Sequence, residues 1–296
     1  MRVRVPATSA NLGPGFDTLG MAFNLYNMVE MDFRPSGLVI EVEGLGKEFI
    51  PTNETNIVYQ SAMRVFKLAG VEVPGLYMKL VNEIPLARGL GSSAAAIVGG
   101  VVAANCLCGG VLGVDALLQI ATDVEGHPDN VAPALLGGFT IAGMENGKVR
   151  SVRLDPLSGL KAVVAVPEFS LSTHKSRGVL PANVSMQDAV FNVSRTAFLV
   201  AALCLGHVEL LSMAMEDRLH QPYRCSLVPG MEQVWQAAKD AGAMSAALSG
   251  AGPCLLAFAM QNTAKIGQAM QATFAQNGVQ AEILVLSPDR AGAMVV

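Results

Sequence analysis

The sequence predicts an α+β protein of two domains, and three observations lead to this prediction. The chain has 296 residues, a length typical of two domains that each have a core. Segments that alternate apolar and polar residues occur beside segments with apolar residues at helical spacing. The second half reads strand, helices, strand, strand, helix, strand, which is the order of a ferredoxin-like domain. We place the boundary at Asp155–Gly159, which gives domains of residues 1–155 and 156–296.

In the first half, alternation and β-branched residues predict strands at Arg2–Pro6, Leu25–Phe33, Leu38–Glu43, Leu76–Ile84, Gly137–Met144 and Lys148–Leu154. The second and third should form an antiparallel pair around the turn Pro35–Gly37, and Asn146-Gly147 favours a tight hairpin between the last two. Helices are expected at Asn56–Ala69 (capped by Asn53 or Thr55), Ala94–Leu107 and Val114–Glu125 (ended by Gly126). The expected loops are Ala7–Thr18 and His127–Pro133.

In the second half, β-rich runs predict strands at Lys161–Val166, Ala243–Leu248, Cys254–Met260 and Gln280–Leu286. Helices are expected at Met186–Leu205, His207–Leu219, Met231–Ala241 and Thr263–Gln276.

Composition argues against several classes of protein. Hydrophobic residues make up 51% of the chain, and the mean hydropathy is +0.42. The longest low-polarity runs, Ala94–Ala104 and Ala197–Gly206, are shorter than the roughly 20 residues that span a bilayer, so we expect buried helices and no membrane partner. The N-terminus lacks the apolar stretch of a signal peptide. A net charge of −4 argues against nucleic acid, and we expect a cytoplasmic location.

The five cysteines form no C-x-x-C pair, which suggests reduced thiols. The pair Cys106-x-Cys108 could suggest a metal site, but it has no second ligand pair.

The stretch Pro85–Ala95, PLARGLGSSAA, joins a predicted strand to a predicted buried helix. Its glycines allow close backbone approach, its serines offer hydroxyl groups, and the helix N-terminus favours an anion. The string also matches the dinucleotide fingerprint G-x-G-x-x-A, but four residues separate the strand from the first glycine and no acid follows at the expected place. A P-loop motif is missing, and a plain packing turn is the remaining alternative. We interpret the stretch as a phosphate-binding loop.

Six stretches together resemble the GHMP small-molecule kinases, the family of galacto-, homoserine, mevalonate and phosphomevalonate kinases. Pro6–Asp17, Pro85–Ala95 and Ser249–Pro253 carry the family resemblance. The other three are similar to the homoserine-kinase branch: Gly126–Pro133 (GHPDNVAP), Leu171–Arg177 (LSTHKSR) and Asp217–Arg224 (DRLHQPYR). The resemblance covers nearly the whole chain. It implies a ribosomal-protein-S5-like first domain with a left-handed βαβ crossover and a ferredoxin-like second domain.

The resemblance also implies ATP and Mg²⁺ as cofactors. The residues expected at the nucleotide are Pro85, Leu86, Ala87, Arg88, Gly89, Leu90, Gly91, Ser92, Ser93, Ala94 and Ala95, with Asn56 and Ile57 at the adenine. We assign Mg²⁺ to the Ser93 hydroxyl and the Glu125 carboxylate, because this hard cation prefers oxygen ligands.

The implied second substrate is L-homoserine, phosphorylated on its hydroxyl group in threonine biosynthesis. The residues expected to bind it are Arg177 and Arg224 (carboxylate), Asn11 and Asp17 (ammonium), His127 and Asn130 (hydroxyl or carboxylate) and Gly250. Guanidinium groups suit a carboxylate because they can donate two parallel hydrogen bonds. His127, Asn130 and Arg177 are the expected catalytic residues. The aspartate base of some GHMP kinases is missing, since Leu171–His174 stands in its place, so we expect catalysis by positioning and charge stabilisation.

Three alternatives remain: a GHMP kinase for shikimate, a sugar or mevalonate, a non-catalytic sensor with the same fold, and a dehydrogenase that uses the G-x-G-x-x-A string. A homodimer is our working hypothesis for the oligomeric state.

Overall fold

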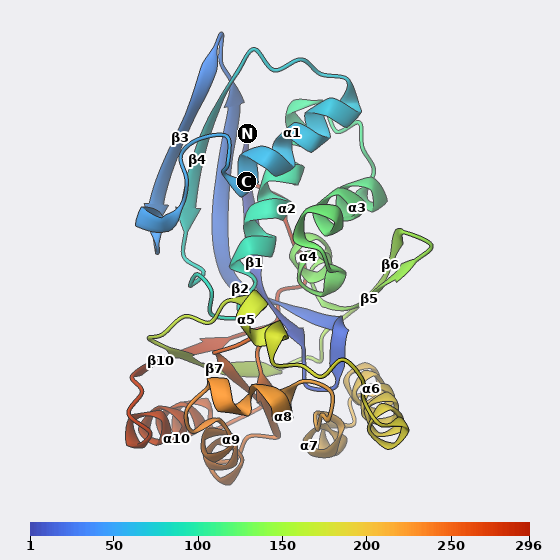
Figure 1. Cartoon of the computed structure of the whole chain (residues 1–296), viewed down its shortest axis with the longest axis vertical. Helices are drawn as coiled ribbons and strands as arrows, with labels where there is room; N and C mark the ends of the chain where they lie inside the picture. Colours follow the sequence, from blue (N-terminus) through green and yellow to red (C-terminus); the bar gives the residue numbers. More distant parts are fainter.

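A computed structural model describes residues 1–296 and contains two β-sheets, one above the other along the long axis of the molecule (Figure 1). The first sheet contains β1 (Arg2–Asn11), β2 (Gly15–Phe33), β3 (Gly37–Gly44), β4 (Gly75–Asn82), β5 (Phe139–Glu145), β6 (Lys148–Leu154) and β11 (Met294–Val295). Its main order is β11-β1-β2-β4-β3, with β5 paired to β2 and β6 paired to β5. The α+β fold class predicted from the sequence is confirmed.

Two predictions for the first sheet are wrong. The expected loop Ala7–Thr18 is mostly strand, because β1 continues to Asn11 and β2 begins at Gly15. The strands β2 and β3 do not pair with each other. Instead β4 lies between them, antiparallel to β2 and parallel to β3. Alternation of apolar and polar residues shows which face of a strand is buried, but not which strand lies beside it. The pattern therefore could not show that β4 lies between β2 and β3.

Four helices cover one side of the first sheet (Figure 1): α1 (Ile57–Ala69), α2 (Ser92–Leu107), α3 (Val114–Glu125) and α4 (Pro128–Leu136). Helix α2 is the central one, and most of its residues are apolar and buried. The N-cap of α1 is Asn56 and not Asn53 or Thr55, since the Asn56 side chain accepts from the Val58 and Tyr59 amides. The expected loop His127–Pro133 is the start of α4, where Pro128 occupies the first helical turn without losing a hydrogen bond.

The second sheet has the order β10-β7-β9-β8 and is antiparallel throughout. Its strands are β7 (Lys161–Pro167), β8 (Ser245–Leu248), β9 (Leu255–Ala259) and β10 (Ala281–Leu286). The remaining helices are α5 (Thr173–Gly178), α6 (Met186–Leu205), α7 (Leu211–Ala214), α8 (Gln221–Arg224), α9 (Met231–Asp240) and α10 (Thr263–Gln276). Short 3₁₀ turns occur at η1 (Lys47–Phe49), η2 (Val208–Leu210) and η3 (Cys225–Leu227). The spatial order of fourth, first, third and second strand matches the ferredoxin-like prediction.

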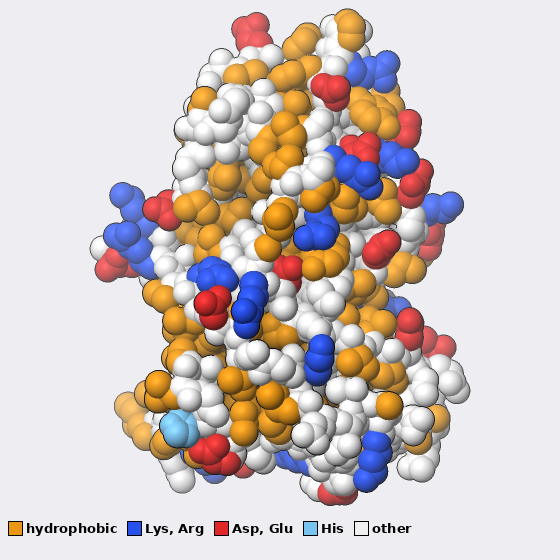
Figure 2. Space-filling model, turned by 180° about the vertical axis from the view of Figure 1, so that it is seen from behind, with side chains coloured by type: hydrophobic (Ala, Val, Ile, Leu, Met, Phe, Trp, Pro, Cys, Tyr) orange, Lys and Arg blue, Asp and Glu red, His pale blue; other side chains and the backbone are white.

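The second half also departs from the prediction in two places. The single helix expected at His207–Leu219 is broken into η2, α7 and a turn, because the Asp217 carboxylate accepts the amides of Leu219, His220 and Gln221 and so competes with helical bonding. The run Ala197–Gly206 at the end of α6 was expected to be buried, but Ala197, Phe198 and residues 204–206 are exposed. In Figure 2, orange hydrophobic side chains gather at the lower left edge, on the side of the molecule where α6 lies.

After β10 the chain returns to the first sheet, where β11 pairs with β1. The last residues therefore belong structurally with the first sheet, although the expected second domain ran to residue 296. The linker between β6 and β7 coincides with the boundary expected at Asp155–Gly159.

Candidate active site

The three family-like stretches of the sequence meet in space, between the two sheets. The Ser249 hydroxyl donates to the carbonyl of Gly89 (2.6 Å) and lies 2.9 Å from the Ser9 hydroxyl. The Thr8 amide donates to the Leu90 carbonyl (3.1 Å). These bonds hold the loop before α2 against both β1 and the turn after β8. The loop is thus braced by residues more than 80 and more than 150 positions away in the chain.

Glycine is required in this loop for steric reasons. Gly91 has φ 69°, and a Cβ atom there would lie 1.9 Å from the Thr8 hydroxyl oxygen. Gly89 has φ 81°, and its Cβ would lie 2.2 Å from the Ser249 carbonyl oxygen. At both positions the backbone has a conformation that residues with a side chain disfavour, and there is no room for a Cβ atom.

The N-terminus of α2 opens onto a cavity beside this loop. The amides of Ser92, Ser93 and Ala94 precede the first intrahelical hydrogen bond, so they are free to donate to an anion. That first bond runs from the Ala95 amide to the Gly91 carbonyl (2.9 Å). Ala95 therefore has no free donor, and its side chain is buried, so its assignment to the nucleotide is not supported. The side chains of Leu90 and Ala94 are also buried, which leaves only their backbone for a ligand.

A second cavity, of about 450 Å³, adjoins the first and is lined by apolar side chains that include Ile57, Leu86 and Leu171. Its size falls in the range of small-molecule sites. Asn56 also lines it, but the Asn56 amide is already used, since it caps α1 and donates to the Pro51 carbonyl (2.7 Å). The Asn56 side chain therefore has only one N–H group that no protein acceptor uses. Pro85 and Arg88 line a neighbouring groove, where the Arg88 guanidinium donates to the Glu168 carbonyl.

Two oxygen groups fit the expected magnesium site. The Ser93 hydroxyl donates to the Glu125 carboxylate (2.8 Å), so the first turn of α2 and the last residue of α3 meet at the cavity. Burial raises the pKa of Glu125, against the lowering effect of the Ser93 hydrogen bond. No three His, Cys, Asp or Glu side chains are grouped to hold a metal ion. A metal here would depend on few protein ligands, which is how Mg²⁺ is commonly held beside phosphates.

All seven residues predicted to bind the substrate line one cavity together with the phosphate loop: Asn11, Asp17, His127, Asn130, Arg177, Arg224 and Gly250. Arg177 forms a two-pronged ion pair with Asp17, at 2.9 and 2.6 Å. The Asn11 side chain accepts from the Asp17 amide (3.0 Å) and donates to the Gly250 carbonyl (2.9 Å). Asn11 and Asp17 both have positive φ, 68° and 54°. Such strain in non-glycine residues is a feature of functional sites.

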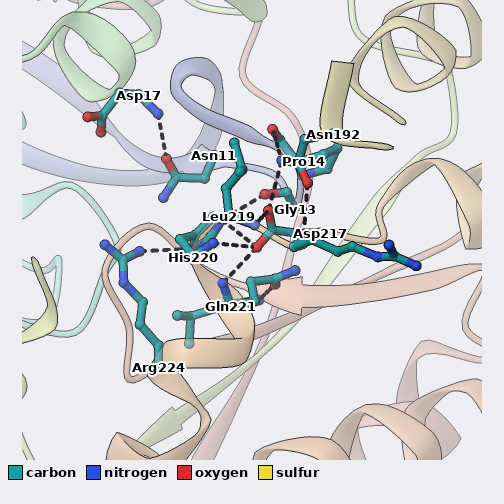
Figure 3. Close-up of polar contacts among 12 residues, drawn as sticks. Asn11, Gly13, Pro14, Asp17, Asn192, Asp217, Leu219, His220, Gln221 and Arg224 are labelled. Carbon is teal, nitrogen blue, oxygen red and sulfur yellow. Dashed lines mark hydrogen bonds and ion pairs between the residues drawn. The ribbon is translucent and has the colours of Figure 1, made fainter. Parts of the chain in front are cut away.

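Arg224 is 1% exposed and is held by a buried network (Figure 3). It donates to the carbonyls of Ser176 and Gly250 (3.2 Å each) and to His220 Nδ1 (3.0 Å). Burial, followed by the nearby Arg177 charge, lowers the pKa of Arg224 to about 10. Both arginines are therefore packed close together at the cavity, an arrangement that favours an anionic ligand.

His220 has its tautomer determined by its two partners. Because a guanidinium can only donate, Nδ1 must accept from Arg224, and because a carbonyl can only accept, Nε2 must donate to Gly13 (2.7 Å). Burial lowers the pKa of His220, which favours this neutral form. The Asp217 carboxylate accepts hydrogen bonds from the backbone amide of His220 and from the Asn192 side chain of α6 (2.9 Å), as Figure 3 shows.

The sequence-based prediction missed two residues that line the cavity, Phe16 and Asp129, and one that supports it, Thr8, although each lies in a stretch that it singled out. Asp129 is buried and bonds His127 (2.7 Å), and this hydrogen bond raises the pKa of His127. The Thr8 hydroxyl donates to the side-chain Oδ1 of Asn130 (2.8 Å). Phe16 stacks on His220, with ring centroids 5.2 Å apart. The sequence placed these residues in the two expected loops Ala7–Thr18 and His127–Pro133, and only the long-range contacts reveal what they hold.

Comparison with known proteins identifies the family. The model of the GHMP kinases N terminal domain matches residues 56–138, and that of the GHMP kinases C terminal matches residues 199–276. The chain belongs to the GHMP kinase family, whose members use ATP.

Among its relatives, a homoserine kinase of Moorella thermoacetica is 49% identical, with 99% of each chain covered. One of Desulfitobacterium hafniense is 50% identical over 100% of both chains. The crystal structure of homoserine kinase from Cytophaga hutchinsonii superposes with a TM-score of 0.91 at 32% identity, covering 100% of this chain and 97% of the other. Within the family, the chain belongs with the homoserine kinases.

Proposed function

We propose that this protein transfers the γ-phosphoryl group of ATP to the hydroxyl group of L-homoserine. One observation carries the proposal. Two arginines and one aspartate, which suit the carboxylate and the ammonium group of an amino acid, line the same cavity as the phosphate loop. Homoserine has a carboxylate for Arg177 and Arg224 and an ammonium for Asp17. The full-length similarity to homoserine kinases supports the same substrate.

The Arg177–Asp17 ion pair matches a zwitterion in charge. An incoming amino acid places its carboxylate against the two arginines and its ammonium against Asp17, so each group of the pair keeps an oppositely charged partner. Arg224 cannot move away, because its hydrogen bonds to two carbonyls and to His220 hold it in place. The cavity is therefore organised before the substrate binds, which lowers the cost of binding.

Catalysis in this site depends on position and charge. The amides at the start of α2 and the hydroxyl of Ser92 hold the phosphates, while His127 and Asn130 lie across the cavity beside the transferred group. The substrate hydroxyl oxygen forms a bond to the γ-phosphorus, the bond from that phosphorus to the β–γ bridging oxygen breaks, and ADP leaves. The hydroxyl proton passes to a γ-phosphate oxygen. Ser93 and Glu125 would hold Mg²⁺, which supplies positive charge to the phosphates.

The direct test is ADP formation with purified protein, ATP and Mg²⁺ and with homoserine, threonine, serine or shikimate in parallel. We expect the highest kcat/KM with homoserine. ADP formation with none of the four would point to the non-catalytic sensor, and a preference for shikimate would contradict the amino-acid site. NAD added alone should give no saturable binding in calorimetry, since tight binding would support the dehydrogenase alternative.

The arginines test the substrate assignment residue by residue. A desolvated carboxylate that loses one charged partner costs about 2–5 kcal/mol. Arg177→Leu or Arg224→Leu should therefore lower kcat/KM for homoserine about 30-fold or more, with the KM for ATP nearly unchanged. Arg150→Leu is the control, because Arg150 of β6 forms an exposed ion pair with Glu145 of β5. Homoserine esters or amides should lose much of the sensitivity to both arginine replacements.

A further inference from the structure

A separate cavity of about 230 Å³ lies between α8 and α9 and shares no lining residue with the substrate cavity. Arg224 of α8 lines the substrate cavity, whereas Gln221 of the same helix and Cys225 directly after it line this one. Residues of α7, α9 and β8 complete its wall, near the lower end of the molecule in Figure 1. We call it the α8–α9 cavity.

Gln221 holds an unused hydrogen-bond donor at this cavity, although the residue is only 5% exposed. Its Oε1 atom accepts from the Leu248 amide (2.8 Å), which determines the orientation of the side-chain amide, and its Nε2 group has no partner within the chain. The indole Nε1 of Trp235, which also lines the cavity, is buried without a partner. Because unpaired buried donors destabilise the folded state, both groups favour a ligand that offers acceptor oxygen atoms.

Two charged side chains of opposite sign remain available at this cavity. Lys239 is the one basic residue in its wall, and Glu232 lies on the same face of α9, seven residues earlier. The other acids of the wall are already paired, Glu216 with Arg195 (3.0 Å) and the Asp217 carboxylate with backbone amides. A ligand that carries both a negative and a positive group therefore suits the cavity.

Much of the remaining wall is apolar. Met215, Ala246 and the ring of Trp235 contribute to it. The Cys225 thiol adds no charge, because burial, followed by the Glu232 charge, raises its pKa to about 11. An apolar side chain of the ligand would be removed from water here.

We propose that the α8–α9 cavity is a second ligand site, which binds an α-amino acid with an apolar side chain. The carboxylate of this ligand accepts from Gln221 Nε2 and lies beside Lys239, its ammonium group faces Glu232, and its side chain packs against Trp235. A cavity of about 230 Å³ has room for one such molecule.

An occupant of this cavity should influence the substrate cavity through α8. Gln221 lies three residues before Arg224, and its Oε1 atom holds Leu248, directly before the turn Ser249–Pro253 that braces the phosphate loop. Figure 3 shows Gln221 next to His220, whose ring bonds Arg224. A ligand bonded to Gln221 restrains α8 in the arrangement that presents Arg224 to the substrate, so we expect it to lower the KM for homoserine. This effect rests on the proposed function, whereas binding in the cavity does not.

Trp235 is the one tryptophan of the chain, so its fluorescence reports directly on this cavity. Titration of the full chain with L-leucine, without ATP or homoserine, should give a saturable change in tryptophan fluorescence. Glycine has the same charged groups but no apolar side chain, and it should bind at least about tenfold more weakly.

Two variants test the contacts with the carboxylate of the ligand. Gln221→Glu keeps the acceptor for the Leu248 amide but replaces the Nε2 donor with a carboxylate oxygen, so the affinity for L-leucine should fall at least about tenfold. Lys239→Gln removes an exposed charge and should weaken binding up to about fivefold. Its matched control is Lys265→Gln, at an exposed lysine of α10 outside the cavity, which should bind L-leucine as wild type does. Thermal melting checks that all three variants fold.

Steady-state kinetics test the link between the two cavities. L-leucine should lower the KM for homoserine and leave the KM for ATP unchanged, and homoserine should in return strengthen the binding of L-leucine. An unchanged KM for homoserine with L-leucine bound would contradict the link through α8.

The absence of a saturable fluorescence change with L-leucine overturns the proposal. So does wild-type affinity in both Gln221→Glu and Lys239→Gln, or equal affinity for glycine and L-leucine. Displacement of L-leucine by homoserine would place it in the substrate cavity and would also overturn the second site. A protein that binds L-leucine as expected but forms no ADP with homoserine would contradict the proposed function and leave this site supported.

Discussion

The buried imidazole of His220 offers a sharp test of how the substrate site is held. His220→Phe keeps an aromatic ring that can stack on Phe16, but it removes the acceptor for Arg224 and the donor to the Gly13 carbonyl. A buried polar group left without its partner costs about 1–3 kcal/mol. Two such groups predict a loss of about 2–6 kcal/mol in the free energy of unfolding.

The same change should affect one substrate selectively. Arg224 keeps its bonds to the Ser176 and Gly250 carbonyls but loses the one that His220 provides, so its guanidinium is less well positioned. We expect kcat/KM for homoserine to fall at least about tenfold, which is about 1.4 kcal/mol, with the KM for ATP within about twofold of wild type. Steady-state kinetics with each substrate varied in turn measures both effects.

His207→Phe is the matched control, since His207 is exposed and bonds only Glu209. It should change neither stability nor kinetics. Equal losses for homoserine and ATP in His220→Phe would mean a general structural defect, and an unchanged kcat/KM for homoserine would refute the positioning role.

The pH dependence follows from the charges around His220. Arg224 repels an imidazolium from 3.0 Å and Asp217 attracts it from 3.5 Å, each by about 5 kcal/mol at an effective dielectric constant of about 20. These two effects nearly cancel, so burial decides and lowers the pKa of His220. Below about pH 6.5, the ordinary histidine value, the unfolded chain then binds more protons than the folded one. The stability that the neutral His220 contributes to the folded state is therefore fully present above that pH and is lost as the pH falls below it. The His220→Phe variant should show a weaker acid loss than wild type in denaturant titrations.

Further predictions concern the phosphate loop and the metal. Gly91→Ala should abolish turnover, because the new Cβ would meet the Thr8 hydroxyl at 1.9 Å. Its control, Gly109→Ala, has a similarly positive φ but no atom within 4 Å, and should keep full activity. Ser93→Ala should lower kcat far more than thermal stability, and full activity at saturating Mg²⁺ would contradict the metal assignment. Asp217→Leu should lower the melting temperature strongly, since three backbone amides and Asn192 would lose their acceptor.

The sequence by itself determined the fold class and predicted which residues would gather around one cavity beside the loop before α2. It could do so because these depend on local patterns: glycines where a side chain cannot fit, apolar runs that must be buried, and short stretches similar to a known family. The seven substrate-site residues were all found in one cavity for this reason.

Tertiary structure decided how those residues are paired. Sequence shows Asp17 and Arg177 only as two charges 160 positions apart, whereas folding brings them into one ion pair. It also decided that β4 lies between β2 and β3, that His220 determines the position of Arg224, and that one face of α6 remains uncovered. Each of these depends on which surfaces meet after the chain has folded, and the periodicity of a segment records which of its faces is apolar but not what that face contacts.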